Sequence, residues 1–165
     1  MIVTNEQMKE KFKKYGEFMS FDLTYGLVRE KTPYSTQYGV GLFCGLSPTY
    51  KITAFAAVFM AKETKEAFRR MFHEFFILME NQPSAILTDD QASIKAALND
   101  LYEDGVFGGT HLQDSFHILR NLRHKLIDKS RMKYFSKLMR CENRSKFSEV
   151  LLNLPQFNSH ENRYL

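Results

Sequence analysis

The stretch that most constrains this chain is residues 18–25, which predict a short β-strand with one carboxylate, Asp22, inside it. Apolar residues flank Asp22, and no basic residue lies within six positions of it. A buried charge must be paired or bind a metal ion, whereas an acid at a strand end can simply be solvated. A second acid, Asp89, follows the apolar run 85–88. Two acids at the ends of two strands suit one divalent-cation site built across a sheet.

The composition indicates a globular, intracellular protein. With 165 residues, 44% of them hydrophobic, and with 15 Phe and 8 Tyr, the chain can bury a core within one domain. Its two cysteines, Cys44 and Cys141, are too few for a disulfide framework and lack CxxC spacing, which favours a reducing compartment. No apolar run approaches 18 residues and no signal-peptide pattern opens the chain, so we expect a soluble protein without a membrane partner.

The charge is distributed unevenly along the chain. Residues 1–119 carry 12 Lys or Arg and 15 Asp or Glu, whereas residues 120–165 carry 11 and 4. A basic C-terminal third beside an acid-bearing core predicts a polyanion partner, although a solvated helix face explains the charge equally well. The basic residues are concentrated at Arg120, Arg123, Lys125, Lys129, Arg131, Lys133, Lys137 and Arg140.

Hydrophobic periodicity predicts three consecutive strands followed by alternating helices and strands. The expected strands are residues 18–25, 36–46, 52–60, 84–88 and, weakened by two glycines, 106–112. The expected helices are residues 5–17, a long helix from Glu63-Thr64, one opened by Asp89-Asp90, one over 115–128, and a basic helical pattern beyond Lys129. One of the acids at 89 and 90 can cap its helix, which is the structural alternative to a metal site. We predict a mixed sheet with helices on both faces.

Two apolar stripes mark the predicted core helices. The first comprises Phe68, Met71, Phe72, Phe75, Phe76 and Met79. The second comprises Ile94, Ala97, Leu98 and Leu101. The helix expected over 115–128 has a further stripe, which comprises Phe116, Leu119, Leu122 and Leu126. Stripes of this spacing are typical of helix faces that pack in a core.

Four local sequences, in order, resemble the blocks of Mutator-like element (MULE) transposases, which are DDE transposases of the ribonuclease-H-like superfamily. They cover roughly residues 18–125. The blocks are Phe21-Asp22-Leu23-Thr24-Tyr25, Glu63-Thr64 with Ala67-Phe68, Pro83 to Asp89 with Ile94 and Ala97-Leu98, and His111 to Leu122.

The resemblance implies a five-stranded sheet in the order 3-2-1-4-5 with Asp22 on a central strand. It divides the chain into an N-terminal helix at 1–17, a ribonuclease-H-like core at 18–128, and a basic segment at 129–165 that begins a helical insertion. It also implies nuclear DNA transposition, with DNA and other transposase subunits as partners. Strand cleavage and transfer would use two Mg²⁺ or Mn²⁺ ions about 3.5–4 Å apart, held by carboxylates. Asp22 and Asp89 would be ligands, and the DNA-binding residues would come from the basic set between Arg120 and Lys133.

The chain departs from the family pattern in three places. Asp114 stands where the family usually has Cys, and the chain has no Trp. The family's third catalytic acid is a Glu on a later helix, so we expect it beyond Leu165, with Glu149 as the best local candidate. His117 and His111 are accessory candidates: His117 can orient a phosphate or water, or it can simply pack at a helix start. By spacing alone, His111, Asp114, His117 and His124 could also bind zinc.

Three functions remain open. The chain is a transposase catalytic core, a non-catalytic DNA-binding or regulatory derivative that lacks the third acid, or another ribonuclease-H-like nuclease. The presence of a third acid distinguishes the catalytic core from the non-catalytic derivative, because two carboxylates alone hold a second metal ion poorly.

Overall fold

The computed structural model describes residues 1–25, 38–125 and 132–153. The chain divides into two compact units, Met1–Gln113 and Asp114–Leu165. Within the described ranges, no helix combines the length and the apolar character needed to cross a membrane.

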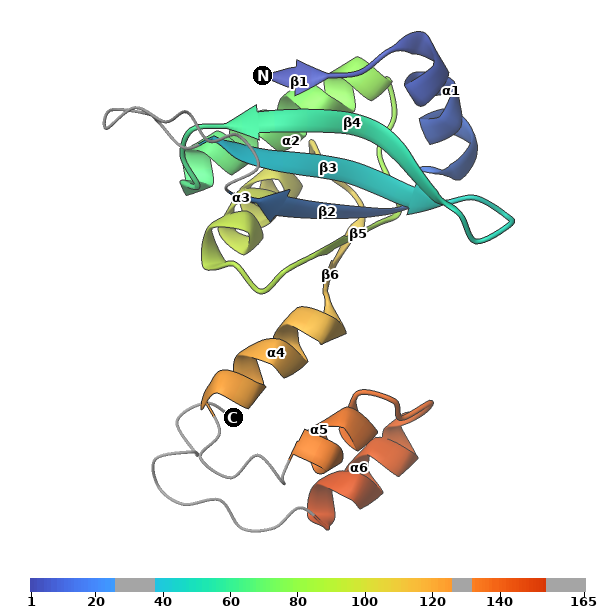
Figure 1. Ribbon diagram of the computed structural model, residues 1–165, viewed down its shortest axis with the longest axis vertical. Helices are drawn as coiled ribbons and strands as arrows, with labels where there is room; N and C mark the ends of the chain where they lie inside the picture. The colour runs from blue at the N-terminus through green and yellow to red at the C-terminus, as the bar shows by residue number, and fades with distance from the viewer. Residues whose placement is uncertain (26–37, 126–131, 154–165) are drawn as a thin grey trace. The chain divides into compact units, whose positions relative to one another are not determined.

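The first unit is built on a six-stranded mixed sheet in the order β1-β4-β3-β2-β5-β6 (Figure 1). The strands are β1 Ile2–Val3, β2 Phe18–Thr24, β3 Gly39–Leu46, β4 Ile52–Met60, β5 Ala85–Thr88 and β6 Thr110–Gln113. The pairs β1–β4, β4–β3 and β3–β2 are antiparallel, whereas β2–β5 and β5–β6 are parallel. The five predicted strands therefore take the predicted order 3-2-1-4-5, and β1 adds a sixth at the edge. The ribonuclease-H-like fold class is confirmed.

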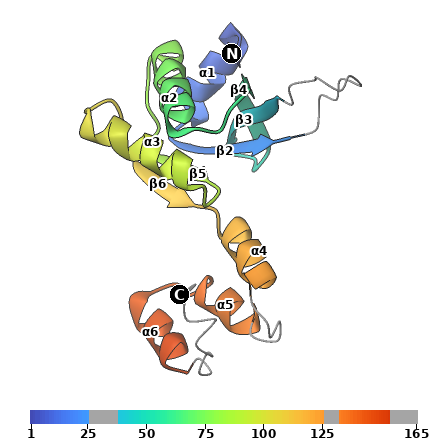
Figure 2. The ribbon, with the colours of Figure 1, turned by 90° about the vertical axis from the view of Figure 1, so that its left-hand side faces the viewer.

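Three helices build the core of this unit (Figure 2): α1 Glu6–Tyr15, α2 Lys65–Met79 and α3 Ala92–Glu103. All predicted stripe residues of α2 and α3 are buried. Aromatic rings join the layers, because Phe43 of β3 stacks on Phe75 of α2 with ring centroids 3.8 Å apart. Phe12 of α1 meets Phe75 edge to face at 5.3 Å. The local start of α2 follows from Thr64, whose side chain accepts the Ala67 N–H at 3.2 Å.

The opposite face of the sheet is less covered within this unit. Phe18, Leu42 and Leu46 are each about half exposed, with 47%, 46% and 52% of their surface accessible. Ile52 is 78% exposed, so the prediction that the 52–60 strand is covered on both faces is wrong at its start. The predicted second helical layer stays a prediction.

Three further details differ from the sequence prediction. The weak strand expected at 106–112 is displaced: β6 is Thr110–Gln113, and Phe107 is a buried core residue whose ring stacks on Phe76 at 5.6 Å. The alternative in which Asp89 or Asp90 is the N-cap residue of α3 is not formed, because the N-cap residue is Gln91, with no side-chain capping bond. The sequence also contained no signal for β1, because two residues are too few to show an alternation.

In the described residues of the second unit there are three short helices: α4 Ser115–Lys125, α5 Met132–Leu138 and α6 Arg144–Leu152. Its small core is formed by Phe135, Leu138 and Val150, with Leu119, Met132 and Cys141 packed against it. Phe116, predicted to lie inside, is 66% exposed. Leu126 lies outside the described residues, as does the side chain of Leu122.

Candidate metal-binding site

The parallel pairing of β2 with β5 brings the two predicted acids to the same edge of the sheet. The paired residues are Phe18 with Ala85, Met19 with Ile86, and Ser20 with Leu87. Asp22 and Asp89 each follow the last of these pairs by two residues. The carboxyl ends of neighbouring parallel strands are where α/β sheets place their ligands. The register therefore supports one site that includes both acids.

Asp22 is exposed, in agreement with the alternative of a solvated acid, so burial does not require it to be paired or to bind a metal ion. Successive strand residues point to opposite faces, which places Asp22 on the face opposite Phe21. Phe21 is 1% exposed, and its ring lies 4.8 Å from Phe43 and 5.4 Å from Phe72. Gly41 allows this close packing, because a Cβ there would approach the Phe21 ring to 2.7 Å. A firmly packed strand thus presents an accessible carboxylate.

Asp89 is half-buried, and the residues around it are held by hydrogen bonds. The Thr88 hydroxyl, 1% exposed, donates to the Asp89 carbonyl oxygen at 2.9 Å and lies 2.8 Å from Nε2 of His111. Asp90 is exposed, and its carboxylate accepts the side-chain N–H of Gln113 at 2.5 Å. Asp90 therefore makes its contact with β6 and not with the helix that follows it.

The sequence did not predict that the Glu63 side chain connects the segments that follow β2 and β5. Glu63, just before α2, accepts a hydrogen bond from Gln91, two residues after Asp89. Tyr25, three residues after Asp22, donates its hydroxyl to the same carboxylate. Burial, reinforced by this Glu63 carboxylate, raises the pKa of Tyr25 to about 12. In the sequence, Glu63 marked the start of a helix and belonged to the second family-like block, but nothing indicated which residues it would contact.

The predicted histidine cluster is not assembled as a metal site. His111 is half-buried, and burial together with the charge of Lys95 lowers its pKa. Asp114 starts α4 by accepting the Phe116 N–H at 2.8 Å, and His117 is half-buried beside the Phe116 ring. Across residues 1–25, 38–125 and 132–153, no three His, Cys, Asp or Glu side chains gather to hold a metal ion. The zinc alternative is therefore not formed among these residues, and within the described part of Met1–Gln113 no third acid is grouped with Asp22 and Asp89.

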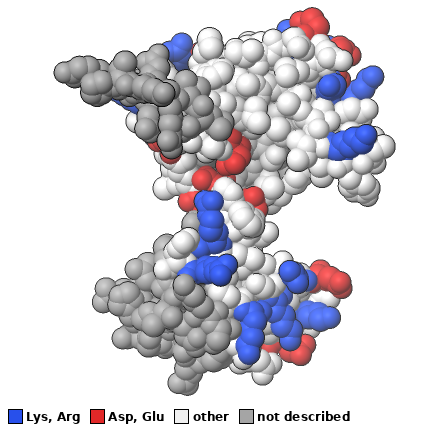
Figure 3. All heavy atoms as spheres, viewed as in Figure 1, with Lys and Arg blue, Asp and Glu red and all other residues white. Residues whose placement is uncertain are grey.

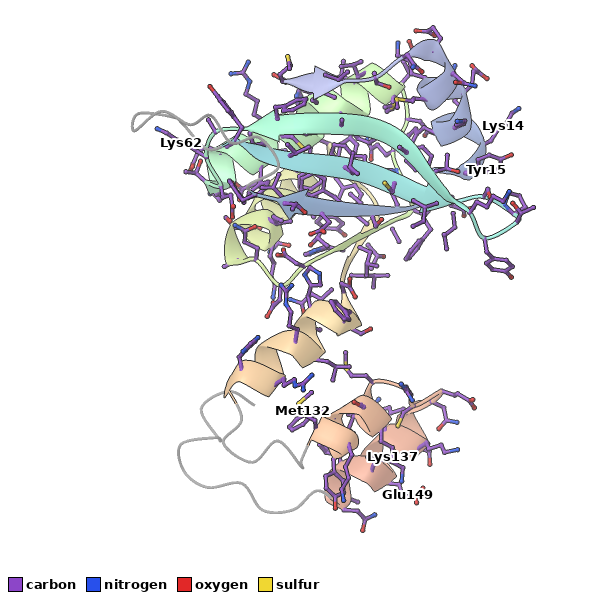
Figure 4. All side chains as sticks on the ribbon, in the orientation of Figure 1. Lys14, Tyr15, Lys62, Met132, Lys137 and Glu149 are labelled. Carbon is purple, nitrogen blue, oxygen red and sulfur yellow. The ribbon has the colours of Figure 1, made fainter. Side chains whose placement is uncertain are left out.

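Glu149, the local candidate for the third acid, is exposed on α6 of the second unit (Figure 4). It directly precedes Val150, which belongs to the small core of that unit. Its participation in a site with Asp22 stays a prediction.

The basic residues of the second unit are exposed wherever they are described (Figure 3). A hollow of about 400 Å³, formed by α5, α6 and the segment between them, is lined by Lys133, Lys137, Arg140 and Lys146 together with Glu142. Arg120 and Arg123 on α4 are also exposed. Lys129, Arg131 and the side chain of Lys125 lie outside what the structure describes. The described set provides an electropositive surface of the kind that neutralises phosphates.

Comparison with known proteins finds similarity to a plant protein and to solved structures. No family model matches the chain. It is 28% identical over 116 residues to Protein FAR1-RELATED SEQUENCE 5 of Arabidopsis thaliana. The matched region covers 70% of this chain but only 14% of the plant protein. The HTLV-2 integrase catalytic core domain in complex with magnesium has a TM-score of 0.43 and 15% identity, covering 86% of both chains. The Mos1 strand transfer complex has a TM-score of 0.41 and 11% identity, covering 96% of this chain and 56% of the other. At these TM-scores the two structures add no argument about function.

The residues at the sheet edge fit a hard divalent cation. Carboxylate oxygens are the ligands that Mg²⁺ prefers, and Mg²⁺ commonly keeps several waters while using one or two protein carboxylates. The exposed Asp22 and the half-buried Asp89 match that pattern, because one side of such an ion would stay open to water and substrate.

Proposed function

We propose that this chain is a transposase-derived domain of the MULE type that binds Mg²⁺ or Mn²⁺ through Asp22 and Asp89 and acts on DNA in the nucleus. The observation that carries the proposal is the parallel β2–β5 register, which brings both acids to one sheet edge. The four sequence blocks, two of which contain these acids, support the MULE assignment, and so does the similarity to a FAR1-related protein over 116 residues.

The chain's own residues have separable tasks in this proposal. When bound, divalent ions would activate a water or a DNA hydroxyl and stabilise the leaving oxygen of a phosphodiester. Asp22 offers its carboxylate on a strand anchored by the buried Phe21 ring. Asp89 offers a second carboxylate next to Thr88, which holds its carbonyl oxygen. Exposed lysines and arginines of the second unit would neutralise the DNA backbone.

A non-catalytic regulatory role is the second candidate. The observation that favours it is the lack of a third acid beside Asp22 and Asp89 within the described residues of Met1–Gln113. Such a domain would keep the fold, metal affinity and DNA contacts without cutting DNA. Because the in-line mechanism uses two ions, we expect the 165-residue chain alone to cleave little or no DNA with Mg²⁺.

Calorimetric titration of the whole chain with Mn²⁺ tests the metal site. Asp22→Asn and Asp89→Asn should each abolish binding, because each removes a charged oxygen ligand while keeping the side-chain size. Asp90→Asn is the matched control and should bind as the wild type does, because Asp90 contacts Gln113. Binding that is unchanged in Asp22→Asn would remove the proposed site.

Nicking of supercoiled plasmid with Mg²⁺ separates the two candidate functions. Robust cleavage that is lost in both Asp22→Asn and Glu149→Gln would identify Glu149 as the third acid and the chain as an active enzyme. Metal binding without cleavage would support the regulatory role. Cleavage that survives Asp22→Asn would contradict both.

A further inference from the structure

Thr88 stands out as the one buried polar residue in the described part of the chain. Buried hydroxyl groups require hydrogen-bond partners, and Thr88 has two of them. They are the carbonyl oxygen of Asp89 at 2.9 Å and Nε2 of His111 at 2.8 Å. A short chain of hydrogen bonds thus runs from β6 through the end of β5 to the residue that we assign as a metal ligand.

The direction of these hydrogen bonds follows from the chemistry of the groups. A carbonyl oxygen can only accept, so the single Thr88 hydroxyl proton is donated to Asp89. The Thr88 oxygen must then accept from His111, which requires a proton on Nε2. The lowered pKa of His111 favours the neutral ring, and neutral His111 is then the Nε2–H tautomer.

The sheet register gives His111 a fixed position for this contact. His111 pairs with Ile86 on β5, and Thr88 lies two residues further on the same face. Both partners are on neighbouring parallel strands, so the donor does not depend on a loop. A rigid donor can set the orientation of the peptide that follows Thr88.

We propose that His111 is a positioning residue, which fixes the main chain at Asp89 through the Thr88 hydroxyl and so orients the Asp89 carboxylate toward a divalent cation. This inference rests on the proposed function, because it assigns a task within the same site. It goes beyond that function by giving the first histidine of the fourth sequence block a defined partner, atom and tautomer.

Mn²⁺ titration of the whole chain tests the role, with Thr88→Val and His111→Leu as the main variants. Thr88→Val removes the hydroxyl at nearly constant shape, and His111→Leu removes the donor. Each should weaken Mn²⁺ binding by about 10- to 100-fold, as is typical for residues that orient metal ligands. The double variant should have the same Mn²⁺ affinity as whichever single variant binds Mn²⁺ less tightly, because both changes break the same chain of hydrogen bonds.

Two further variants separate positioning from general stabilisation. His111→Gln can keep an N–H donor near the position of Nε2 and should restore most of the Mn²⁺ affinity. His73→Leu alters another half-buried histidine, on α2, and should leave the affinity unchanged. If Thr88→Val and His111→Leu fold and bind Mn²⁺ as tightly as the wild type, the positioning role of His111 is refuted, while the proposed metal site is not.

The tautomer supplies a test that needs no variant. Long-range ¹H–¹⁵N spectra of the wild-type chain should show His111 protonated at Nε2, and an Nδ1–H tautomer would overturn the inference even if the variants fail to fold. Absence of Mn²⁺ binding in the wild type would instead remove the proposed function, and the positioning role with it.

Discussion

Truncation of Phe21 should strongly destabilise the first unit, because this ring holds the strand that carries Asp22. Phe21 is 1% exposed, and its ring contacts Phe43, Phe72 and Phe68 with centroid distances of 4.8, 5.4 and 6.3 Å. Replacing a buried Phe with Ala costs about 3–5 kcal/mol of unfolding free energy. Aromatic pairs of this kind add about 0.5–1.5 kcal/mol each beyond their buried area, so we expect Phe21→Ala in the upper half of that range.

Urea unfolding followed by circular dichroism measures this loss, because the chain has no Trp to report by fluorescence. Small proteins have m-values of about 1–3 kcal/mol/M, so the midpoint should fall by at least ~1 M. The matched control is Phe116→Ala, which removes the same ring from a side chain that is 66% exposed. It should change stability by no more than about 0.5 kcal/mol. A cost below ~1 kcal/mol for Phe21→Ala, or equal costs for the two variants, would refute the assigned packing.

Two further predictions concern charge. Because the pKa of Tyr25 is raised from 10.0 to about 12 in the fold, neutral Tyr25 stabilises the protein below pH 10, and this contribution is lost as the pH rises through about 12. Glu63→Gln should lower the pKa of Tyr25 only part of the way toward 10, since the effect of burial remains. NMR titration of the Tyr25 ring measures this pKa, and an unchanged value in Glu63→Gln would show that Tyr25 and Glu63 do not interact. Reversing the charge of Lys133, Lys137 and Arg140 should flatten the salt dependence of duplex DNA binding by about 2 to 3 in logarithmic slope, measured by fluorescence anisotropy. An unaltered slope, matching that of charge reversals on α1, would place the DNA path elsewhere.

The sequence predicted the elements whose pattern repeats over many residues. The stripe from Phe68 to Met79 spans three turns, and all its members are buried, because a long apolar face can be stabilised only by packing. The strand order agrees with the one that the family resemblance implied, whereas the antiparallel start and the later helix–strand alternation predicted only a mixed sheet. Short segments carry less information, which explains the missed β1 and the displaced β6.

The site was predicted less completely, because a pattern shows which residues share a face but not what covers that face. The sequence left open whether Asp22 is buried or solvated, and it is exposed; Phe116 was expected inside and is largely exposed. The position of Asp22 and Asp89 at one edge followed correctly from strand order and parallel register. The contacts of Glu63 with Tyr25 and Gln91 could not be predicted, since they depend on loops far apart in the sequence.

The parallel pairing of β2 with β5 also bears on the time course of folding. The β3–β4 hairpin joins neighbours in the sequence, from Gly39 with Met60 down to Leu46 with Ile52. The β2–β5 pairs begin with Phe18 and Ala85, so a long loop must close before they form. Contacts of high sequence separation form slowly, because the entropy of loop closure is lost before the contacts stabilise the chain. The strands that carry Asp22 and Asp89 therefore pair late, and the proposed metal site can form in a nascent chain only when its sheet is nearly complete.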